Sequence, residues 1–246
     1  MKRLMISGAC GKMGRLIAQE ATGFGFQVTG GVDRSPERYA EFPVYSTFGE
    51  AGVTADALID FSSPDSLPAL LAFAGERRLP CVLGTTGYTP EELKSIKEAA
   101  LDLPIFQSFN MSKGVYALTQ LASLASKLLP GYDIEIVEKH HSQKADSPSG
   151  TARSLLDSVR NLETLPVYGR VGIDTKRKSG EIGIHSVRGG TVAGEHEVGF
   201  YGSNEVITLM HQAQSRIIFV TGALSAASWL TGKGPGLYGM GDMMGF

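Results

Sequence analysis

The chain has 246 residues, of which 42% are hydrophobic and 20% are charged. This composition is typical of a globular protein with one large domain or two modest ones. Its 23 Lys and Arg residues nearly balance 25 Asp and Glu residues, and the formal net charge of −2 argues against general nucleic-acid binding. The basic run 176–178 is therefore interpreted as a solvated loop. Two cysteines, Cys10 and Cys81, are too few for a disulfide framework or a structural zinc site, and no metal is expected.

The N-terminal segment raises the question of a targeting signal, because two basic residues precede a short apolar run. That run ends at Ser7 and Gly8 and is too short for the core of a signal peptide. No uninterrupted apolar stretch reaches the roughly 18 residues that span a bilayer. The sequence therefore predicts a soluble cytoplasmic protein that has no membrane partner.

Short apolar runs alternate with helical patterns through the first half of the chain. The strands expected from these runs are 3–7, 26–32, 57–61, 81–83 and 104–109. Apolar residues recur at helical spacing from Met13 to Ala21, a helix is expected over 65–78, and Thr89 with Pro90 opens another. This alternation with short connections predicts an α/β fold with a doubly wound parallel sheet of the Rossmann type and helices on both faces.

The pattern changes after about residue 130. Residues 133–136 alternate polar and apolar side chains, and 149–160 form one expected helix. From 181 to 210, strand-like runs follow one another without a helix between them. This part of the chain predicts a second domain of the α+β class with a mixed or antiparallel sheet. An expected helix over 217–230, with several small residues, follows it.

A glycine-rich loop lies between the first expected strand and the first expected helix. The loop consists of Gly8, Ala9, Cys10, Gly11, Lys12, Met13 and Gly14, in a GxxGxxG spacing rather than the commoner GxGxxG. A phosphate that approaches backbone N–H groups at a helix N-terminus requires glycine, because a Cβ atom would hold it away. The loop alone is a weak indication, since glycine-rich turns are also common structural devices.

An acidic residue follows at the end of the second expected strand, where a dinucleotide site needs one. Asp33 lies 19 residues after Gly14 and can accept hydrogen bonds from the ribose hydroxyls of the adenosine. The adjacent Arg34 can pair with the 2′-phosphate of NADP, and Lys12 can assist. These residues predict that both NADH and NADPH are accepted. The alternative is that 33–36 is only a polar turn.

Two further segments end strands at the same edge of the expected sheet. The candidate residues in them are Gly84, Thr85, Thr86, Ser108, Phe109, Asn110 and Met111. Ligands of doubly wound sheets lie outside these strand ends, so both segments are candidates to contact the nicotinamide end of a cofactor. A tight turn explains 84–87 equally well, whereas Asn110 offers both a donor and an acceptor for a carboxamide.

The segment 138–152 carries the sharpest chemical pattern. His140, His141 and Lys144 stand just before a helix that begins Ser-Gly-Thr. Free N–H groups at a helix start bind a carboxylate, the lysine can neutralise it, and the threonine adds a hydroxyl group. If the chain is extended here, the two histidines point to opposite faces, which indicates two roles rather than one shared metal ion. Histidine is well suited to donate a proton near neutral pH.

The remaining candidates carry weaker indications. His185, His196 and His211 are isolated in the sequence and are interpreted as structural. The segment 188–190 is either a loop that closes over a ligand or a hairpin turn. Cys10 has no neighbouring base in the sequence that would make it a nucleophile.

Together, these residues resemble the 4-hydroxy-tetrahydrodipicolinate reductase family, also called dihydrodipicolinate reductases, of the diaminopimelate route to lysine. The resemblance covers essentially the whole chain, and 138–152 is its most specific part. It is carried by the glycine loop, 59–62, 84–87, Asn110 with Gly114, Glu138-x-His140-His141-x-x-Lys144-x-Asp146-x-Pro148-Ser149-Gly150-Thr151-Ala152, and 236–238.

The resemblance implies a dinucleotide-binding domain built from both chain ends, 1–110 and 216–246. It implies a substrate-binding and oligomerisation domain, 111–215, in a homotetramer. The implied NADPH or NADH site is lined by 8–13, 33–34, 84–86 and 108–111. His140 and Lys144 are the implied proton donors, and the residues implied to hold a small dicarboxylate substrate are His141, Lys144, Gly150 and Thr151.

Two positions depart from the family pattern. Lys12 stands where many members have arginine, which keeps a cation near the phosphates and bears on cofactor preference. Ser63 stands where some members have arginine before the proline, which weakens a contact near the nicotinamide.

The mechanism that the resemblance implies is hydride delivery to ring carbon C4 of a cyclic dihydro-imine, followed by protonation of C3 by His140 or by a water that it positions. The species reduced is either this dehydrated ring or its hydroxylated tetrahydro form, with loss of water. A redox sensor that binds NADP(H) without turnover is an alternative of another class, but it has no need of the cluster around His140 and Lys144. A purely oligomeric scaffold is a third alternative, but such a protein has no need of the glycine loop.

Overall fold

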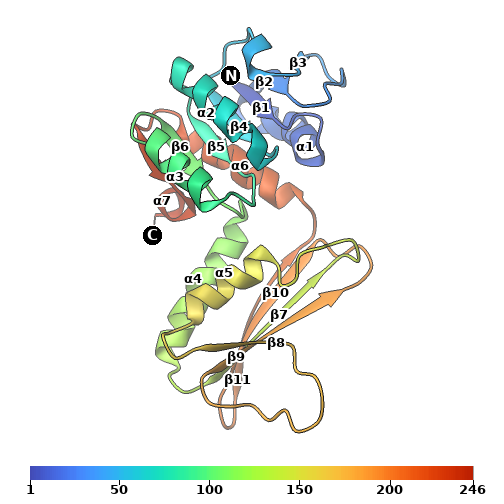
Figure 1. Cartoon of the computed structure of the whole chain (residues 1–246), viewed down its shortest axis with the longest axis vertical. Helices are drawn as coiled ribbons and strands as arrows, with labels where there is room; N and C mark the ends of the chain where they lie inside the picture. Colours follow the sequence, from blue (N-terminus) through green and yellow to red (C-terminus); the bar gives the residue numbers. More distant parts are fainter. Residues whose placement is uncertain (246) are drawn as a thin grey trace. The chain divides into compact units, whose positions relative to one another are not determined.

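The computed structural model describes residues 1–245 (Figure 1). The chain forms two compact units. The first contains Met1–Ser112 and the segment from Ile217 onward, and the second contains Lys113–Arg216. Each unit has its own β-sheet and its own buried core. None of the helices within residues 1–245 is long and apolar enough to cross a membrane.

Seven parallel strands form the sheet of the first unit, in the order β12-β6-β5-β4-β1-β2-β3. Their bounds are β1 (Lys2–Ser7), β2 (Phe26–Val32), β3 (Val44–Tyr45), β4 (Ala57–Asp60), β5 (Cys81–Leu83), β6 (Pro104–Gln107) and β12 (Gly236–Tyr238). The strand order changes direction between β1 and β4, which is the topological switch point of a doubly wound fold. Ligands of such folds bind outside the carboxyl ends of the strands at that point.

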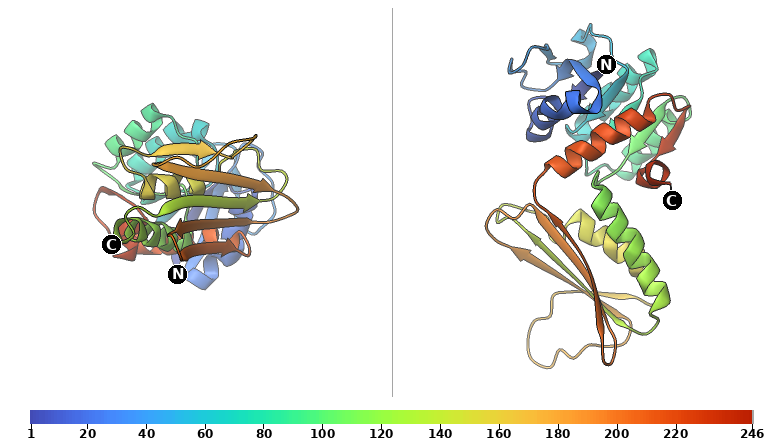
Figure 2. Two further views of the ribbon diagram at one scale, coloured as in Figure 1. Left: turned by 90° about the horizontal axis from the view of Figure 1, so that it is seen from below. Right: turned by 180° about the vertical axis from the view of Figure 1, so that it is seen from behind.

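Helices cover both faces of this sheet (Figures 1 and 2). α2 (Leu67–Arg77) and α3 (Pro90–Ala99) lie on one face, and α1 (Lys12–Glu20) and α6 (Ile217–Leu230) lie on the other. A short helix, α7 (Met240–Met244), follows β12. The predicted doubly wound sheet of the Rossmann type is therefore confirmed.

Local sequence explains how α3 begins and how α6 packs against its neighbour. At the start of α3, the Thr89 hydroxyl accepts a hydrogen bond from the N–H of Glu92 at 3.2 Å, and the Glu92 carboxylate accepts one from the N–H of Thr89 at 2.7 Å. α6 packs closely because Gly222 has no side chain, since an added Cβ atom would lie 1.7 Å from the carbonyl oxygen of Met111. The small residue is thus required where α6 meets the segment after β6.

The second unit contains a five-stranded mixed sheet in the order β11-β10-β7-β9-β8. Its strands are β7 (Asp133–His140), β8 (Leu165–Tyr168), β9 (Glu181–Arg188), β10 (Gly194–Tyr201) and β11 (Val206–Ala213). β10 runs antiparallel to both neighbours, whereas β7, β9 and β8 run parallel. α4 (Lys113–Leu128) and α5 (Gly150–Val159) lie over one face, and among the described residues no helix of this unit covers the other (Figure 2). The predicted α+β class with a mixed sheet is confirmed.

β7 determines which side chains reach each face of this second sheet, because neighbouring side chains along a strand alternate. Ile136 is fully buried in the core formed with α4 and α5. Glu138 and His140 follow it at spacings of two and four residues and lie on the same face. Glu135 lies on the opposite face. We call the helix-covered side the inner face and the uncovered side the outer face.

Several boundaries differ from the sequence expectation, and β7 extends to His140, four residues beyond the alternating pattern over 133–136. The strand expected over 104–109 ends at Gln107, because the Ser108 hydroxyl hydrogen-bonds the backbone of Asn110 and forms a turn. The helix expected over 65–78 begins with a separate 3₁₀ turn, Pro64–Ser66, before α2.

Five helices and strands of the described chain were not among those expected from the sequence. α4 forms a 16-residue helix whose buried residues Val115, Leu118 and Ala122 have helical spacing, and Ser112, a residue type common at N-caps, directly precedes it. The other four are the short helix α7 and the short strands β3, β8 and β12. Strands of two to four residues carry too little alternation to be recognised by pattern.

Candidate active site

The glycine loop lies at the carboxyl end of β1, at the switch point of the parallel sheet. Gly8 has a left-handed backbone with φ of +76°, and an added Cβ atom would lie 2.5 Å from the carbonyl oxygen of Phe61. Gly14 lies in the first turn of α1, where a Cβ atom would lie 2.2 Å from the carbonyl oxygen of Gly8. These two glycines allow the turn itself and the close packing of α1 against it.

Gly11 has a different role, because it is the N-cap of α1 and has no side chain to cap the helix. An added Cβ atom there would meet only the carbonyl oxygen of Gly8, at 3.2 Å. Gly8, Cys10 and Gly11 line a cavity of about 590 Å³. The first-turn N–H groups of α1 and this open side of the loop fit the pyrophosphate of a dinucleotide.

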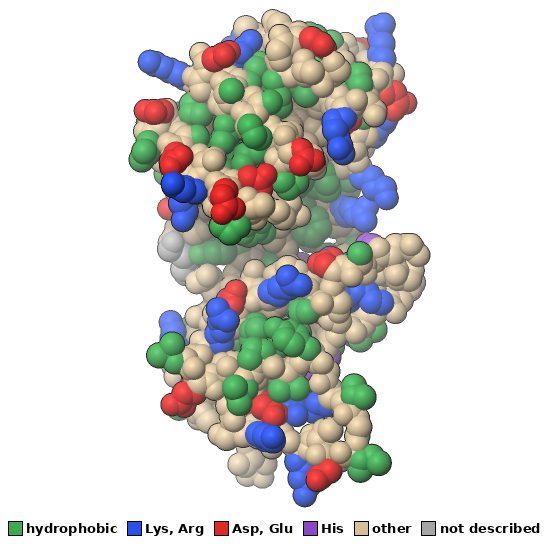
Figure 3. Space-filling view, in the orientation of Figure 1, with side chains coloured by type: hydrophobic (Ala, Val, Ile, Leu, Met, Phe, Trp, Pro, Cys, Tyr) green, Lys and Arg blue, Asp and Glu red, His purple; other side chains and the backbone are tan. Residues whose placement is uncertain are grey.

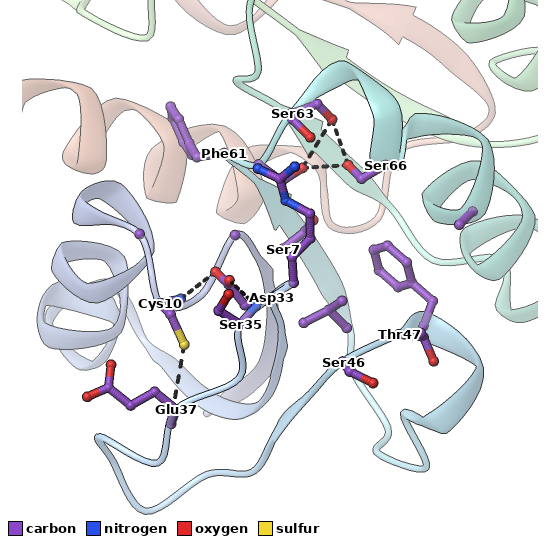
Figure 4. Close-up of a pocket in the computed structure, with 17 residues that line it drawn as sticks. Ser7, Cys10, Asp33, Ser35, Glu37, Ser46, Thr47, Phe61, Ser63 and Ser66 are labelled. Carbon is purple, nitrogen blue, oxygen red and sulfur yellow. Dashed lines mark hydrogen bonds between the residues drawn. The ribbon is translucent and has the colours of Figure 1, made fainter.

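Asp33, at the end of β2, lines the same cavity, and Figure 4 shows its carboxylate between Cys10 and Ser35. The N–H of Cys10 donates to Asp33 Oδ2 at 2.9 Å, and the N–H of Ser35 donates to Oδ1 at 3.1 Å. Arg34 is exposed and lines the cavity as well. The structure thus brings together the glycine loop, the acid and the arginine. A carboxylate with four acceptor sites keeps room for ribose hydroxyls beside these two bonds.

Other expected cofactor residues do not line this cavity. Lys12 is exposed and Met13 is half-buried in the first turn of α1. Ala9 is fully buried, and its carbonyl oxygen accepts a hydrogen bond from the Tyr39 hydroxyl at 2.8 Å. Ala9 therefore supports the loop from inside the fold.

Asp60, at the end of β4, is a buried carboxylate that holds neighbouring loops together, and it was not among the expected site residues. Its Oδ1 accepts a hydrogen bond from the Ser62 hydroxyl at 2.5 Å, and its Oδ2 accepts one from the Thr85 hydroxyl at 2.6 Å. The Thr85 hydroxyl is therefore engaged within the protein, whereas Thr86 is exposed. An added Cβ atom at Gly84 would lie 2.5 Å from the Phe61 ring. An acid at the end of an otherwise apolar strand is the signal that marks such a residue.

The segment after β6 is shaped by its own hydrogen bonds. The Ser108 hydroxyl donates to the carbonyl oxygen of Asn110 at 2.7 Å, and Asn110 Oδ1 accepts a hydrogen bond from the N–H of Ser112 at 2.9 Å. Met111 is buried, while the Phe109 side chain is more than half exposed. This turn therefore presents the Phe109 ring to the solvent at the carboxyl edge of the sheet.

In the second unit, Glu138 and His140 lie on the inner face of β7. Glu138 is fully buried, and its Oε2 lies 2.5 Å from His140 Nδ1. Arg188 ends β9, and the register of the two parallel strands places it opposite His140. Its Nη2 donates to Glu138 Oε1 at 2.7 Å, and its Nη1 donates to Oε2 at 3.0 Å. Both carboxylate oxygens are thus held by a charged fork. The segment 188–190, left open by the sequence, contributes this arginine to the cluster.

Ser149 connects this cluster to α5. Its N–H donates to Glu138 Oε1 at 3.2 Å, and its hydroxyl accepts a hydrogen bond from the N–H of Ala152 as the N-cap. The same hydroxyl lies 3.0 Å from His196 Nε2, and the ring of His196 lies edge-on to His140 with centroids 5.1 Å apart. His196 is isolated in the sequence, but the antiparallel register of β10 and β7 places it opposite Glu138 and within this cluster.

The loop between β7 and α5 carries the remaining expected substrate residues. Lys144 Nζ donates to Asp146 Oδ1 at 2.7 Å. His141 is half-buried just after the end of β7. Gly150 begins α5 and is exposed, and no atom lies within 4 Å of an added Cβ atom there. The start of this ten-residue helix is thus open to a carboxylate.

Burial and charge shift the pKa values of this cluster. Burial alone would raise the pKa of Glu138, but hydrogen bonds from Arg188, Ser186 and His140 lower it to about 2. Burial lowers the pKa of His140, and the charges of Lys144 and Arg188 act in the same direction while Glu138 opposes them. Glu138 is therefore a carboxylate, and His140 without a ligand is mostly neutral at pH 7.

Burial also lowers the pKa of His196 to about 3, so this histidine is neutral. One ligand atom each from Glu138, His140 and His196 lies within 4.8 Å of the others, a spacing compatible with a metal ion. However, Arg188 places a positive charge on both oxygens of Glu138, which opposes a second cation. We interpret the cluster as a hydrogen-bond network that orients His140.

A second cluster of the same residue types lies on the outer face of β7. Glu135 Oε2 lies 2.8 Å from His185 Nε2, and Oε1 accepts hydrogen bonds from Arg170 and Arg177. Arg177 also pairs with Asp133. The interpretation of 176–178 as a solvated loop is therefore wrong for Arg177, whose side chain is mostly buried by these partners.

Charges elsewhere are mixed in sign. Figure 3 shows Lys and Arg side chains interspersed with Asp and Glu side chains on the visible face of each unit. No extended basic surface is seen on that face. This distribution agrees with the formal net charge of −2.

Comparison with known proteins connects both units to one family. Residues 2–111 match the family model of the dihydrodipicolinate reductase N-terminus, and residues 114–244 match that of the C-terminus. The chain is 49% identical to the 4-hydroxy-tetrahydrodipicolinate reductase of Caldanaerobacter subterraneus, over 99% of this chain and 98% of that one. It is 43% identical to the enzyme of the same name from Clostridium novyi, over 99% and 98% of the two chains.

A solved structure supports the same assignment. The dipicolinate-bound dihydrodipicolinate reductase from Paenisporosarcina sp. TG-14 superimposes with a TM-score of 0.78 at 25% identity, over 97% of each chain. The resemblance inferred from the sequence motifs is confirmed. The chain belongs to the dihydrodipicolinate reductase family, also named 4-hydroxy-tetrahydrodipicolinate reductases.

Proposed function

We propose that this chain reduces 4-hydroxy-tetrahydrodipicolinate, or the dihydrodipicolinate formed from it, to tetrahydrodipicolinate in the diaminopimelate route to lysine. When bound, NADH or NADPH supplies the hydride that adds to ring carbon C4. The observation that carries the proposal is the buried cluster of Glu138, His140 and Arg188 at the start of α5. It offers a proton-transfer group beside a helix terminus that binds carboxylates.

The cofactor residues follow from the first unit. We assign the pyrophosphate to the loop from Gly8 to Met13 and the adenosine ribose to Asp33. Arg34, with Lys12 nearby in the sequence, is assigned to the 2′-phosphate of NADPH. The segments 84–86 and 108–111 are assigned to the nicotinamide end. The pyrophosphate and ribose assignments are supported by the open side of Gly11 and by the cavity that Asp33 and Arg34 share, whereas the nicotinamide assignment follows from the family resemblance.

The substrate residues follow from the second unit. The substrate is a small dicarboxylate, and a carboxylate needs N–H donors and a cation. Gly150 and Thr151 in the first turn of α5 supply backbone donors, and Lys144 supplies the cation. His141 completes this group. Asp146 pairs with Lys144 at 2.7 Å, so the Lys144 ammonium group already has a geometry that suits a carboxylate.

His140 is the proposed donor of the proton to ring carbon C3. Its Nδ1 faces Glu138, so Nε2 is the atom that carries the transferred proton. Burial lowers the pKa of His140, and a bound dianion raises it again by favouring the imidazolium. Lys144 is the second group in the cluster that can supply a proton. Hydride addition at C4 and protonation at C3 together saturate that bond of the ring.

The oligomeric state and the location complete the proposal. The outer face of the second sheet exposes Val187, Tyr201, Val206 and Met210, all on strands that no helix of the described unit covers. An apolar patch of this kind supports association through this sheet, and we propose a homotetramer. Sedimentation velocity measures this directly. As a biosynthetic enzyme, the protein is proposed to act in the cytoplasm.

The proposed activity is tested by following nicotinamide absorbance. Substrate is made in place from pyruvate and aspartate semialdehyde by the preceding synthase, and NADPH and NADH are supplied separately. Rapid synthase-dependent loss of absorbance with either cofactor is expected, and Arg34→Ala should lower the NADPH rate more than the NADH rate. A protein that binds the cofactor but oxidises neither would instead be a sensor.

A further inference from the structure

The carboxylate of Glu138 is the least solvated charge in the described part of the second unit, and the proposed substrate contacts do not include it. Its side chain has no solvent exposure. Hydrogen bonds reach its two oxygens from Arg188 Nη1, Arg188 Nη2, the N–H of Ser149 and His140 Nδ1, and the Ser186 side chain adds a further one. A buried carboxylate is costly unless its acceptor sites are filled, and here they are filled by groups of the active site.

Arg188 fixes this carboxylate from the neighbouring strand. Besides its fork to Glu138, its Nη2 donates to the carbonyl oxygen of Asp146 at 2.8 Å. The N–H of Gly189 donates to the carbonyl oxygen of His140 at 3.0 Å. Arg188 thus connects β9, β7 and the loop that carries Lys144. A lysine at this position could neutralise Glu138 but could not make the two parallel bonds of the fork.

We propose that Glu138 and Arg188 are positioning residues for His140: Glu138 holds the ring by Nδ1 and sets its proton affinity, and Arg188 holds Glu138 in place. This inference rests on the proposed role of His140 as proton donor. The pair acts on the same side chain that the reaction uses, yet neither residue touches the ring carbons of the substrate. It also aligns His140 with the start of α5, because Ser149 bonds the same carboxylate.

The surroundings of His140 show how this pair acts. Glu138 on β7 favours the protonated ring, whereas Arg188 on β9 and Lys144 in the following loop disfavour it. His196 on β10 contacts the ring edge-on and is neutral. On the other side, an added Cβ atom at Gly194 would lie 3.1 Å from His140 Nε2. Glu138 is therefore the one carboxylate among the described residues that offsets burial and two cations.

The first test is an NMR titration of His140 in protein labelled with ¹⁵N at histidine, with His140→Gln used to assign the resonances. In the wild type, the neutral ring should carry its proton on Nδ1. In Glu138→Gln, the titration midpoint of His140 should fall by about one pH unit, because the opposing charge is lost. A wild-type ring protonated on Nε2, or a midpoint that does not move, would overturn the proposal.

The second test is kinetic and uses matched controls from an exposed pair at the C-terminal end of α5. Asp157 lies on the helix and Arg160 is its C-cap, and their side chains lie 3.0 Å apart. Glu138→Gln and Arg188→Lys should each lower kcat about tenfold or more, and Glu138→Gln should move the alkaline limb of the kcat profile to lower pH. The affinity for NADH, measured by fluorescence, should stay the same. Asp157→Asn and Arg160→Lys should leave all these values unchanged.

The outcomes separate the two proposals. A wild type that fails to oxidise NADH and NADPH contradicts the reductase assignment, while the titration still decides whether Glu138 controls His140. An active wild type whose Glu138→Gln and Arg188→Lys variants match their controls contradicts the positioning role alone. If Glu138→Gln does not fold, as judged by circular dichroism, Arg188→Lys decides. A kcat within twofold of Arg160→Lys then overturns the proposal.

Discussion

Two glutamates of β7, three residues apart, each meet a histidine and an arginine, but on opposite faces of one sheet. Glu138 pairs with His140 and Arg188 on the inner face, and its side chain is 0% exposed. Glu135 pairs with His185 and with Arg170 and Arg177 on the outer face, with 19% of its side chain exposed. The residue types and the bond lengths are similar, but the burial of the two clusters and the elements around them differ.

The difference between the two clusters lies in their burial and in the element that adjoins each carboxylate. On the inner face, burial shifts the pKa of His140, and the N-cap of α5 shares the Glu138 carboxylate. On the outer face, one third of the His185 side chain is exposed, and no helix start adjoins Glu135 in the described contacts. Ion pairing alone is therefore no mark of a catalytic site. Burial beside a helix N-terminus, where we propose that substrate binds, is the feature that distinguishes the inner cluster.

Replacing the two histidines should produce the largest contrast. His140→Gln removes the proposed proton donor, and kcat should fall about 10²- to 10⁴-fold while the Kd for NADH changes little. His185→Gln, on the outer face, should change kcat far less. Steady-state assays with a separate fluorescence titration of NADH measure both quantities. A His140→Gln enzyme that retains turnover within a few-fold would remove the distinction between the two faces.

Removing one partner from each cluster should distinguish the two clusters by their effect on stability. Arg188→Met leaves Glu138 as a buried charge without its main partner, and the free energy of unfolding should fall by roughly 3 kcal/mol. Glu135→Gln on the outer face should cost clearly less, because water and several cations reach that site. Urea denaturation of the two variants measures the difference. Equal losses would show that burial does not distinguish the faces.

A smaller effect is expected from His196 on the inner face, in the pH dependence of the free energy of unfolding. The pKa of His196 is lowered from 6.5 to about 3, so between these values the unfolded chain binds a proton that the folded protein does not. Its contribution to stability is complete above pH 6.5 and is lost as the pH falls toward 3. His196→Gln should reduce the slope of unfolding free energy between pH 6 and 5 by up to about 1.4 kcal/mol per pH unit. An unchanged slope would contradict this account of His196.

Much of the first unit follows from the sequence, because its site is built from backbone. A strand, a glycine loop, a helix and an acid at the next strand end are all local signals, and the structure places Gly11, Asp33 and Arg34 around one cavity. Asp60 was not predicted as a site residue because one of its two partners, Thr85, lies 25 residues away in the sequence. The pairing of β4 with β5 brings this partner to it.

The second unit was harder to predict because its central cluster also combines residues that are far apart in the sequence. The motif around His140 is local, whereas Arg188 and His196 reach it through strand register, one from a parallel neighbour and one from an antiparallel neighbour. In a mixed sheet, the sequence of each strand does not show which other strands it pairs with. Arg188 continues the two-residue spacing of Ile182, Ile184 and Ser186 along the strand. This spacing predicts that the arginine lies on the buried face, and it is the signal that could have identified it.

The position of the transferred hydrogen tests the central claim most directly. The substrate is reduced with NADH deuterated at its transferable hydrogen, and the product is examined by mass spectrometry and NMR. We predict one deuterium at ring carbon C4, none from the cofactor at C3, and loss of the reaction in His140→Gln at unchanged NADH affinity. Deuterium at another ring carbon, or an unlabelled product, would contradict the account.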